Sequence, residues 1–266
     1  MNIATEGADV VTEDKLSILP ALRERSVLGS LGATFLTGLS GDVSIPKYSG
    51  SSVTWEGETV AAKDGEGTID SVKYSPKRLT AKIDISKQFL IQDSVGAEAM
   101  LRSDLVNAIM EKLEATLLGS AAGSATQPAG LFNLVAPTAS VKTYAGVVGL
   151  ESALEANKVM GEIKFALSPA AKATMKTTQA FTGAGAGILN GSEMDGLKYE
   201  STGNIPANHF ALGKWSDYVV CQFGAMDITV DPYSQAANGV VRLVVNAYFD
   251  AKPRRAESFV TAKTIA

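Results

Sequence analysis

The longest regular pattern of apolar positions lies in residues 93–119, DSVGAEAMLRSDLVNAIMEKLEATLLG. Apolar residues recur there with a spacing of four: Leu101, Leu105, Ile109, Leu113 and Leu117. This spacing gathers them on one face of a helix. The opposite stripe is polar and holds Ser103, Asp104, Asn107, Glu111 and Glu114. We therefore predict a long amphipathic helix, the spine helix, of about 36 Å at about 1.5 Å per residue. Its single apolar face requires another element packed along it.

The residues at the two ends of this segment favour helix termini. Asp93 or Ser94 can cap the start through a side-chain oxygen, and Gly119 is expected to adopt the left-handed conformation past the end. No proline interrupts the segment, so one continuous helix is predicted.

The period of the pattern changes to two between residues 41 and 86. Val53 and Trp55 alternate with polar neighbours, and in the returning arm the alternating apolar residues are Leu79, Ala81, Ile83 and Ile85. Asp64-Gly65 between the arms is a hairpin turn signal, and Pro76 is expected to break the returning arm. A two-stranded ribbon of this length is marginally stable alone in water. It is therefore predicted to rest on another surface, which in an oligomer can belong to a neighbouring copy.

The segment before the ribbon, residues 1–40, is acidic at first and then apolar but punctuated by glycines. A short helix is expected from Pro20 to Arg25. Nothing in this segment predicts a core of its own, so we interpret it as an arm that packs on something else.

Helices and strands alternate after the spine helix. Residues 120–133 are rich in small and turn residues and indicate a boundary loop. Helices are expected at 149–160 and from Ser168-Pro169, a cap followed by a first-turn proline. Residues 181–196 are expected to form a long loop. Strands are predicted at 164–167, 197–199, 210–212, 218–222, 226–230, 240–249 and 258–264. The order lacks a strict βαβ rhythm, which predicts the α+β class.

Composition narrows the class of protein. The chain has 266 residues, 45% of them hydrophobic, enough for a sizeable core. A net charge of -4 with mixed acids and bases lacks the signature of a nucleic-acid binder, although a mildly acidic protein can still surround DNA without binding it. Cys221 is the only cysteine, which excludes an intrachain disulfide and a cysteine-cluster metal site. No signal peptide or membrane span of about 20 apolar residues is recognised, so cytoplasmic synthesis is expected.

Candidate chemistry is sparse. His209 is the only histidine, so a Ser-His-Asp or Cys-His mechanism would have to use it; the alternative is a loop or edge histidine. Arg254 and Arg255 form a basic pair. The simplest interpretation is that they lie in a solvated turn, and the more specific alternatives are that they contact a phosphate or form a salt bridge between subunits. We predict no catalytic residues, no cofactor and no metal site.

The chain resembles the major capsid proteins of tailed bacteriophages, the family whose fold is named after phage Hong Kong ninety-seven. The resemblance lies in three stretches: SVTWEGETV at 52–60, SPKRLTAKIDISKQFLIQDS at 75–94 and LEATLLGSAAGSATQPAGLFN at 113–133. The tail VVRLVVNAYFDAKPRRAESFVTAK at 240–263 is also similar. The order and spacing of these stretches along the chain carry the resemblance.

The resemblance implies a division of the chain. An N-terminal arm would span 1–40, an extended loop 41–86, a peripheral domain with the spine helix 87–130, an axial domain 131–224, and returning C-terminal strands 225–266. Copies would form the pentamers and hexamers of an icosahedral shell around double-stranded DNA, in a virion assembled in the host cytoplasm, without a membrane. A portal protein, a scaffolding protein or protease, and a decoration protein are the implied partners. The scaffolding segment that often precedes the arm in this family is not recognised here.

Particular residues follow from the same resemblance. Interaction roles are expected for Trp55, Glu56, Glu58 and Lys63 near the loop tip and for Arg254 and Arg255. Some members cross-link a tip lysine to an asparagine of a neighbour with help from an acid. Lys63 and Asn238 are the candidates, but no acid stands clearly beside either in the sequence. The alternative is that Lys63 is a solvated tip residue.

Two other functions compete with a phage capsid. An encapsulin, a cellular compartment of the same fold, would hold enzymes rather than DNA. A hydrolase or transferase using His209 and a nearby serine would be a small soluble monomer or dimer.

Overall fold

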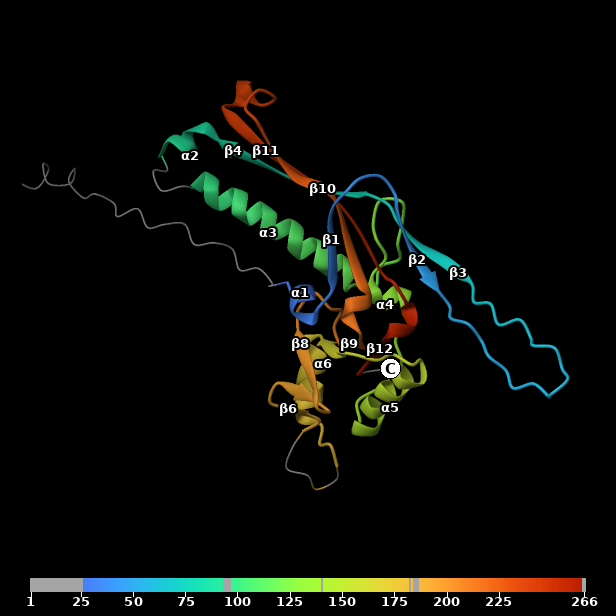
Figure 1. The fold of residues 1–266 in the computed structure, drawn as a ribbon. Coiled ribbons are helices and arrows are strands. Elements are labelled where there is room, and N and C mark those ends of the chain that lie inside the picture. Colours follow the sequence, from blue (N-terminus) through green and yellow to red (C-terminus); the bar gives the residue numbers. More distant parts are fainter. Residues whose placement is uncertain (1–25, 93–96, 140, 182, 184–186, 265–266) are drawn as a thin grey trace, which may run out of the picture.

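The structure is a computed structural model that describes residues 26–92, 97–139, 141–181, 183 and 187–264. It has a four-stranded sheet with the spine helix along it, a six-stranded sheet with its own helices, and a separate two-stranded ribbon (Figure 1). This mixture confirms the predicted α+β class. The expected helix from Pro20 to Arg25 and the caps Asp93 and Ser94 lie outside the described residues.

The spine helix is α3, Ala97–Leu117, preceded by the short α2, Lys87–Gln92. Its predicted apolar face is confirmed, since Leu105, Ile109, Leu113 and Leu117 are buried. Two predictions about this segment are wrong. Glu114, expected on the exposed stripe, is 1% exposed. Gly119 does not adopt the left-handed conformation, and the chain there instead passes close to Gly130.

The four-stranded sheet has the order β1-β10-β11-β4. Its strands are β1, Thr34–Leu39, β4, Lys77–Ser86, β10, Tyr218–Asp231, and β11, Val240–Pro253. The two strands predicted at 218–222 and 226–230 are one, because β10 keeps pairing with β11 across an irregularity between Phe223 and Asp227. Gly224, with a φ of 66°, lies in that irregularity, as expected for a bulge.

The six-stranded sheet has the order β12-β9-β5-β8-β7-β6. Its strands are β5, Lys164–Leu167, β6, Leu189–Asn190, β7, Glu193–Met194, β8, Leu197–Ser201, β9, His209–Gly213, and β12, Phe259–Lys263. The prediction for β5 is confirmed at both ends. Part of the loop expected at 181–196 instead forms the β6–β7 hairpin.

Helices α5, Tyr144–Ala156, and α6, Pro169–Thr177, accompany this sheet. Ser168 caps α6 as predicted, since its Oγ accepts a hydrogen bond from the Ala171 N–H at 3.2 Å. Helix α5 begins earlier than predicted because Thr143 caps it through the Gly146 N–H. The shorter elements are α4, Leu131–Leu134, and the 3-10 turns η1, Trp215–Asp217, η2, Ala236–Asn238, and η3, Ala256–Ser258.

The ribbon consists of β2, Val43–Tyr48, and β3, Ile69–Tyr74, paired antiparallel. It ends before Pro76, where the chain changes sheets, as predicted. Beyond the paired part the two arms are extended but not strands, so the strand expected around Val53 and Trp55 is wrong. The tip turn is also not at Asp64-Gly65. It lies at Gly57–Val60, with a hydrogen bond from the Val60 N–H to the Gly57 carbonyl at 3.1 Å.

Part of the expected arm belongs to the packed body. Leu28 and Leu31 of α1, Leu28–Leu31, are buried in the main core beside α3, and β1 pairs in parallel with β10. Residues 27–39 therefore pack on the body of the molecule rather than forming a core of their own, as expected for this segment. Among the described helices, none is long and apolar enough to cross a membrane.

Candidate interaction surfaces

The tip of the ribbon exposes apolar side chains to an unusual degree. Val53 is 95% exposed and Trp55 is fully exposed, with Val60 more than half exposed. Figure 1 shows this tip projecting far from the body of the molecule. Burying a side chain as large as tryptophan contributes about 2 kcal/mol or more of stabilising free energy. In the isolated chain Trp55 is not buried, so this free energy is not gained. The tip is therefore a candidate contact surface.

Charges at the tip are organised around one ion pair. Lys63 Nζ lies 3.0 Å from Glu56 Oε1, which also accepts a hydrogen bond from Thr54 Oγ1 at 3.1 Å. The sequence reading that no acid stands beside Lys63 is thus wrong. The two residues are apart in sequence but face each other across the turn. Glu58 is exposed within the turn itself.

The base of the ribbon is held firmly by Asp250, which is 1% exposed. Its carboxylate accepts hydrogen bonds from Lys77 Nζ at 3.0 Å and from the Ser75 N–H at 3.1 Å. Nearby, Lys252 Nζ donates to the Lys73 carbonyl at 3.0 Å. Burial raises the pKa of Tyr74 to about 12, so this phenol stays neutral. The ribbon is consequently anchored at one end and unsupported at the other.

The two arginines expected to act as a pair have different surroundings. The Arg254 N–H donates to the Asp217 carbonyl at 2.7 Å, and its buried Nε has no hydrogen-bond partner among the described residues. Arg255 instead lines an open cavity of about 320 Å³ between the outer end of β2, the residues that follow α5 and the η3 turn. Arg255 is therefore the member of the pair that can meet a partner in solution.

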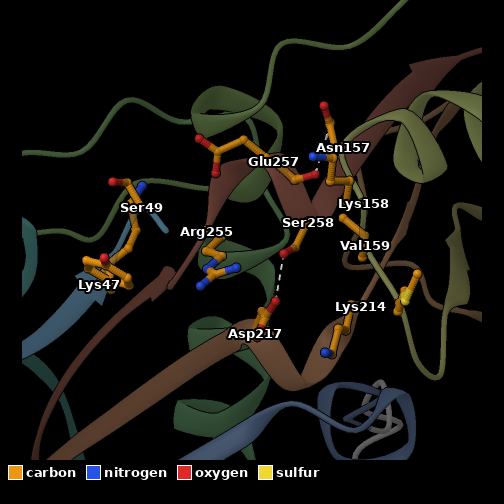
Figure 2. A pocket seen from close by; sticks show the side chains of 12 residues that line it. Lys47, Ser49, Asn157, Lys158, Val159, Lys214, Asp217, Arg255, Glu257 and Ser258 are labelled. Carbon is orange, nitrogen blue, oxygen red and sulfur yellow. Dashed lines mark hydrogen bonds between the residues drawn. The ribbon is translucent and has the colours of Figure 1, made fainter. Parts of the chain in front are cut away.

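This cavity carries an excess of positive charge. Figure 2 shows its cations, Lys47, Lys158, Lys214 and Arg255, and the acids Asp217 and Glu257. Asp217 is held by Ser258, whose Oγ donates to its Oδ2 at 2.6 Å. The lysines come from three separate segments, so no motif pointed to them. The cavity suits an anionic group, since its four cationic side chains outnumber its two acidic ones by two.

Asn238 lies at the opposite hairpin, in the turn η2 between β10 and β11. Its Nδ2 donates to Gln235 Oε1 at 2.7 Å. This turn and the ribbon tip lie at opposite ends of the molecule in Figure 1. A bond between Lys63 and Asn238 would therefore join two subunits rather than two parts of one.

His209 shows packing and hydrogen bonding of an ordinary kind. Its Nδ1 lies 2.8 Å from the Ala207 carbonyl, and its ring packs edge-on against Phe132 at 5.2 Å between centroids. Neither contact supplies the nucleophile or the acid of a catalytic triad. Within the described part of the chain, no group of three His, Cys, Asp or Glu residues is placed to hold a metal ion.

Comparison with known families decides the class. The sequence profile of the phage capsid family matches residues 10–264. The chain belongs to this family. It is 27% identical over 250 residues to the major capsid protein of Halomonas phage phiHAP-1, and the alignment covers 91% of this chain and 41% of that protein. It is also 28% identical over 93 residues to the major capsid protein of Klebsiella oxytoca phage phiKO2, and this alignment covers 35% of this chain and 22% of that protein. The chain thus spans less than half the length of these curated relatives.

Solved structures show the same fold. The capsid of an empty GTA particle aligns with a TM-score of 0.81 at 16% identity, covering 99% of this chain and 98% of that chain. A structure from Mycobacterium phage Adephagia aligns with a TM-score of 0.76 at 11% identity, covering 100% and 98%. These alignments confirm the Hong Kong ninety-seven type capsid fold. They do not favour the encapsulin alternative.

Proposed function

We propose that this member of the phage capsid family is the major capsid protein of a tailed double-stranded DNA bacteriophage, with a structural rather than an enzymatic role. Copies assemble into the pentamers and hexamers of an icosahedral head that encloses the genome. The family match over residues 10–264 supports this most strongly. The projecting ribbon, with its exposed apolar tip, fits a chain completed by its neighbours. Repeating a modest interface under closed symmetry yields a stable container.

The proposed division of the chain follows the family. It comprises an arm at 1–40, an extended loop at 41–86, a peripheral domain at 87–130, an axial domain at 131–224 and C-terminal strands at 225–266. The ribbon and α3 support the second and third parts. The six-stranded sheet supports the axial domain, although its edge strand β12 comes from the last part.

The proposed subunit contacts lie at the tip and at the η3 turn. At the tip they are Trp55, Glu56, Glu58 and Lys63, all within the unsupported part of the ribbon. At the turn they are the pair Arg254 and Arg255. The exposure of Trp55 and the position of Arg255 at the basic cavity support these assignments.

A covalent link between Lys63 and Asn238 is a further proposal drawn from the family. Lys63 Nζ would attack the side-chain carbonyl carbon of Asn238 of another copy, forming an amide and releasing ammonia. Glu56, 3.0 Å from Lys63, is placed to accept the lysine proton. Shells boiled in detergent would then give a ladder of linked chains, absent in Lys63→Arg and in Asn238→Asp. Complete dissociation to monomers would instead make Lys63 a solvated tip residue paired with Glu56.

Other partners are proposed from the family alone. They are a portal protein, a scaffolding protein or protease, and a decoration protein. The proposed location is the virion, with assembly in the host cytoplasm.

Size-exclusion chromatography with negative-stain microscopy tests the proposed function. The full chain is examined at low and high concentration, alone and with scaffolding and portal proteins supplied. Closed shells, or rings of five and six, are the expected result, and DNA inside shells from infected cells separates a phage head from an encapsulin. A chain that stays monomeric even with both partners present contradicts the proposal.

A further inference from the structure

A groove of about 140 Å³ lies where α3, the start of β4 and the loop 119–130 meet. Its floor is apolar and consists of Leu79, Leu113, Pro128 and Phe249. Leu113 and Phe249 belong to the main core, so the floor is rigid and is part of the packed body. The groove is thus a pre-formed apolar depression of a kind that accepts one large side chain.

The rim of this groove is positively charged. It includes Lys77, Arg78 and Lys112, and no acid is among the described residues that line it. Lys77 is neutralised by Asp250 at 3.0 Å. Arg78 bonds only a neutral partner in the described contacts, since Nη2 donates to Asn246 Oδ1 at 2.7 Å. Arg78 and Lys112 therefore give the rim a net positive charge.

The ribbon tip has the complementary composition. Trp55 is fully exposed, and it is followed directly by Glu56 and, after Gly57, by Glu58. Across residues 56–66 the tip has four acids and one lysine. An aromatic ring beside carboxylates matches an apolar floor with a cationic rim.

We propose that the groove receives Trp55 of a second copy of this chain, with the tip carboxylates facing Arg78 and Lys112. The inference rests on the proposed function and names the surface that the ribbon meets. The chain's own tip is excluded as occupant in this structure, because the ribbon is anchored at its base by Asp250 and projects away from the body. The tip must therefore be received by another molecule.

The larger cavity beside Arg255 suits Trp55 less well. Its lining is dominated by charged and polar side chains (Figure 2), and an indole buried there would displace water from groups that it cannot hydrogen-bond. The floor of the groove between α3 and β4 is instead apolar, so it can contact the indole ring without leaving polar groups unpaired. Tryptophan is also among the residues that most often dominate interface energetics when they enter such a depression.

Disulfide trapping tests the proposal with the full chain. Thr54→Cys next to Trp55 is combined with Gln127→Cys on the rim of the groove. Shells are assembled under reducing conditions and then oxidised. A ladder of chains linked between subunits on a non-reducing gel is expected, whereas either single variant gives monomers. The buried Cys221 stays out of this reaction.

The matched control combines Thr54→Cys with Glu193→Cys, which is exposed on β7 far from the groove in sequence. This pair is expected to give no ladder. Normal shells in which the Gln127 pair gives no ladder, or no more than the control pair, overturn the groove assignment while leaving the capsid function intact. Failure of the unaltered chain to form shells with its partners overturns both proposals.

Charge exchange gives a second test that does not depend on cysteine geometry. Glu58→Lys and Lys112→Glu are each expected to reduce the yield of shells, by about tenfold if the charges meet in the interface. The double variant is expected to recover most of that yield. Trp55→Ala is expected to lose about tenfold or more of the yield of shells, while the matched Phe181→Ala, an exposed aromatic between α6 and β6, is expected to assemble normally. Equal yields from Trp55→Ala and the unaltered chain, or no recovery in the double variant, contradict the proposal.

Discussion

The carboxylate of Glu114 accepts a hydrogen bond from the backbone N–H of Val27 at 2.6 Å. The same Oε1 accepts from the Leu28 N–H at 2.9 Å, and Oε2 accepts from Asn204 Nδ2 at 3.2 Å. One buried acid of the spine helix thus joins the segment that enters α1 and the loop that precedes β9. The position where the N-terminal segment meets the body is fixed by this acid.

Removing the Glu114 carboxylate is expected to destabilise the unassembled chain. Glu114→Ala leaves two buried backbone N–H groups and an amide without their acceptor, which costs about 2–4 kcal/mol. Urea denaturation followed by circular dichroism measures this loss. Glu155→Ala, which removes an exposed glutamate of α5, is the control and is expected to change the free energy of unfolding by less than about 0.5 kcal/mol. Equal stabilities of the two variants would contradict the role of Glu114.

Glu114 is also expected to make stability depend on pH. Burial raises the pKa of its carboxyl above the ordinary value of 4.5, although the hydrogen bonds from Val27, Leu28, Asn204 and Ser26 oppose that shift. A raised pKa in the folded state means that the stabilising contribution is present below pH 4.5 and is lost as the pH rises through the folded-state pKa.

The comparison that isolates this effect is with Glu114→Gln, which keeps an oxygen acceptor and cannot ionise. Asn204 can then present its own oxygen to the new amide. The free energy of unfolding of the unaltered chain is expected to fall relative to the variant as the pH increases above 4.5. A difference that stays constant across the titration would show that Glu114 does not titrate with a raised pKa.

Gly130 is expected to tolerate no side chain. A Cβ at this position would lie 2.1 Å from the Gly119 carbonyl oxygen, a backbone atom just after α3 that cannot move aside as a flexible side chain could. Its φ of -74° suits any residue, so the cost of Gly130→Ala is steric, about 3 kcal/mol or more. Gly149→Ala in α5 is the matched control. It meets nothing within 4 Å and is expected to stabilise by about 0.5–1 kcal/mol. Thermal unfolding of both variants measures the two changes in stability, which are expected to be a lower melting temperature for Gly130→Ala and a higher one for Gly149→Ala.

Local patterns in the sequence predicted much of the fold. The spacing of Leu105, Ile109 and Leu113 gave the buried face of α3 because helix periodicity is a property of neighbouring residues. Ser168-Pro169 located the start of α6 for the same reason. Glu114 could not be placed correctly, since its donors at Val27 and Asn204 lie 87 and 90 residues away.

The candidate surfaces were predicted unevenly. The sequence pointed to Trp55 and Lys63 through resemblance to a family, but not to the ion pair of Lys63 with Glu56, which forms only when the tip folds back. The groove beside α3 was missed entirely. Its lining comes from β4, α3, β11 and the loop 119–130, and no spacing in one segment records that arrangement.

Cys221 is expected to be nearly inert in the folded chain. Burial, and secondarily the charge of Asp250, raises the pKa of its thiol to about 11, and only the thiolate reacts. At pH 8 a thiol-specific colour reagent should label the native chain at least about a hundredfold more slowly than the chain in denaturant. The reason is that each unit by which the pKa rises lowers the fraction of thiolate about tenfold. Similar rates in the two states would show that Cys221 is accessible.

Charge reversal at the ribbon tip is expected to impair assembly much more than folding. Glu58 and Glu66 are exposed and lie beyond the paired part of the ribbon, so Glu58→Lys with Glu66→Lys should change the free energy of unfolding by less than about 0.5 kcal/mol. In a shell the same side chains would meet a neighbour in every copy, so a small loss per contact is multiplied across the assembly.

Light scattering and negative-stain microscopy then give the decisive comparison, at matched protein concentration and at two salt concentrations. The double variant is expected to form few shells, whereas Glu193→Lys, an exposed acid of β7, should assemble like the unaltered chain. Because charges at the rim of an interface are screened by salt, the difference is expected to narrow at the higher ionic strength. Normal shells from the tip variant at both salt concentrations would show that the ribbon is not an element of contact between subunits.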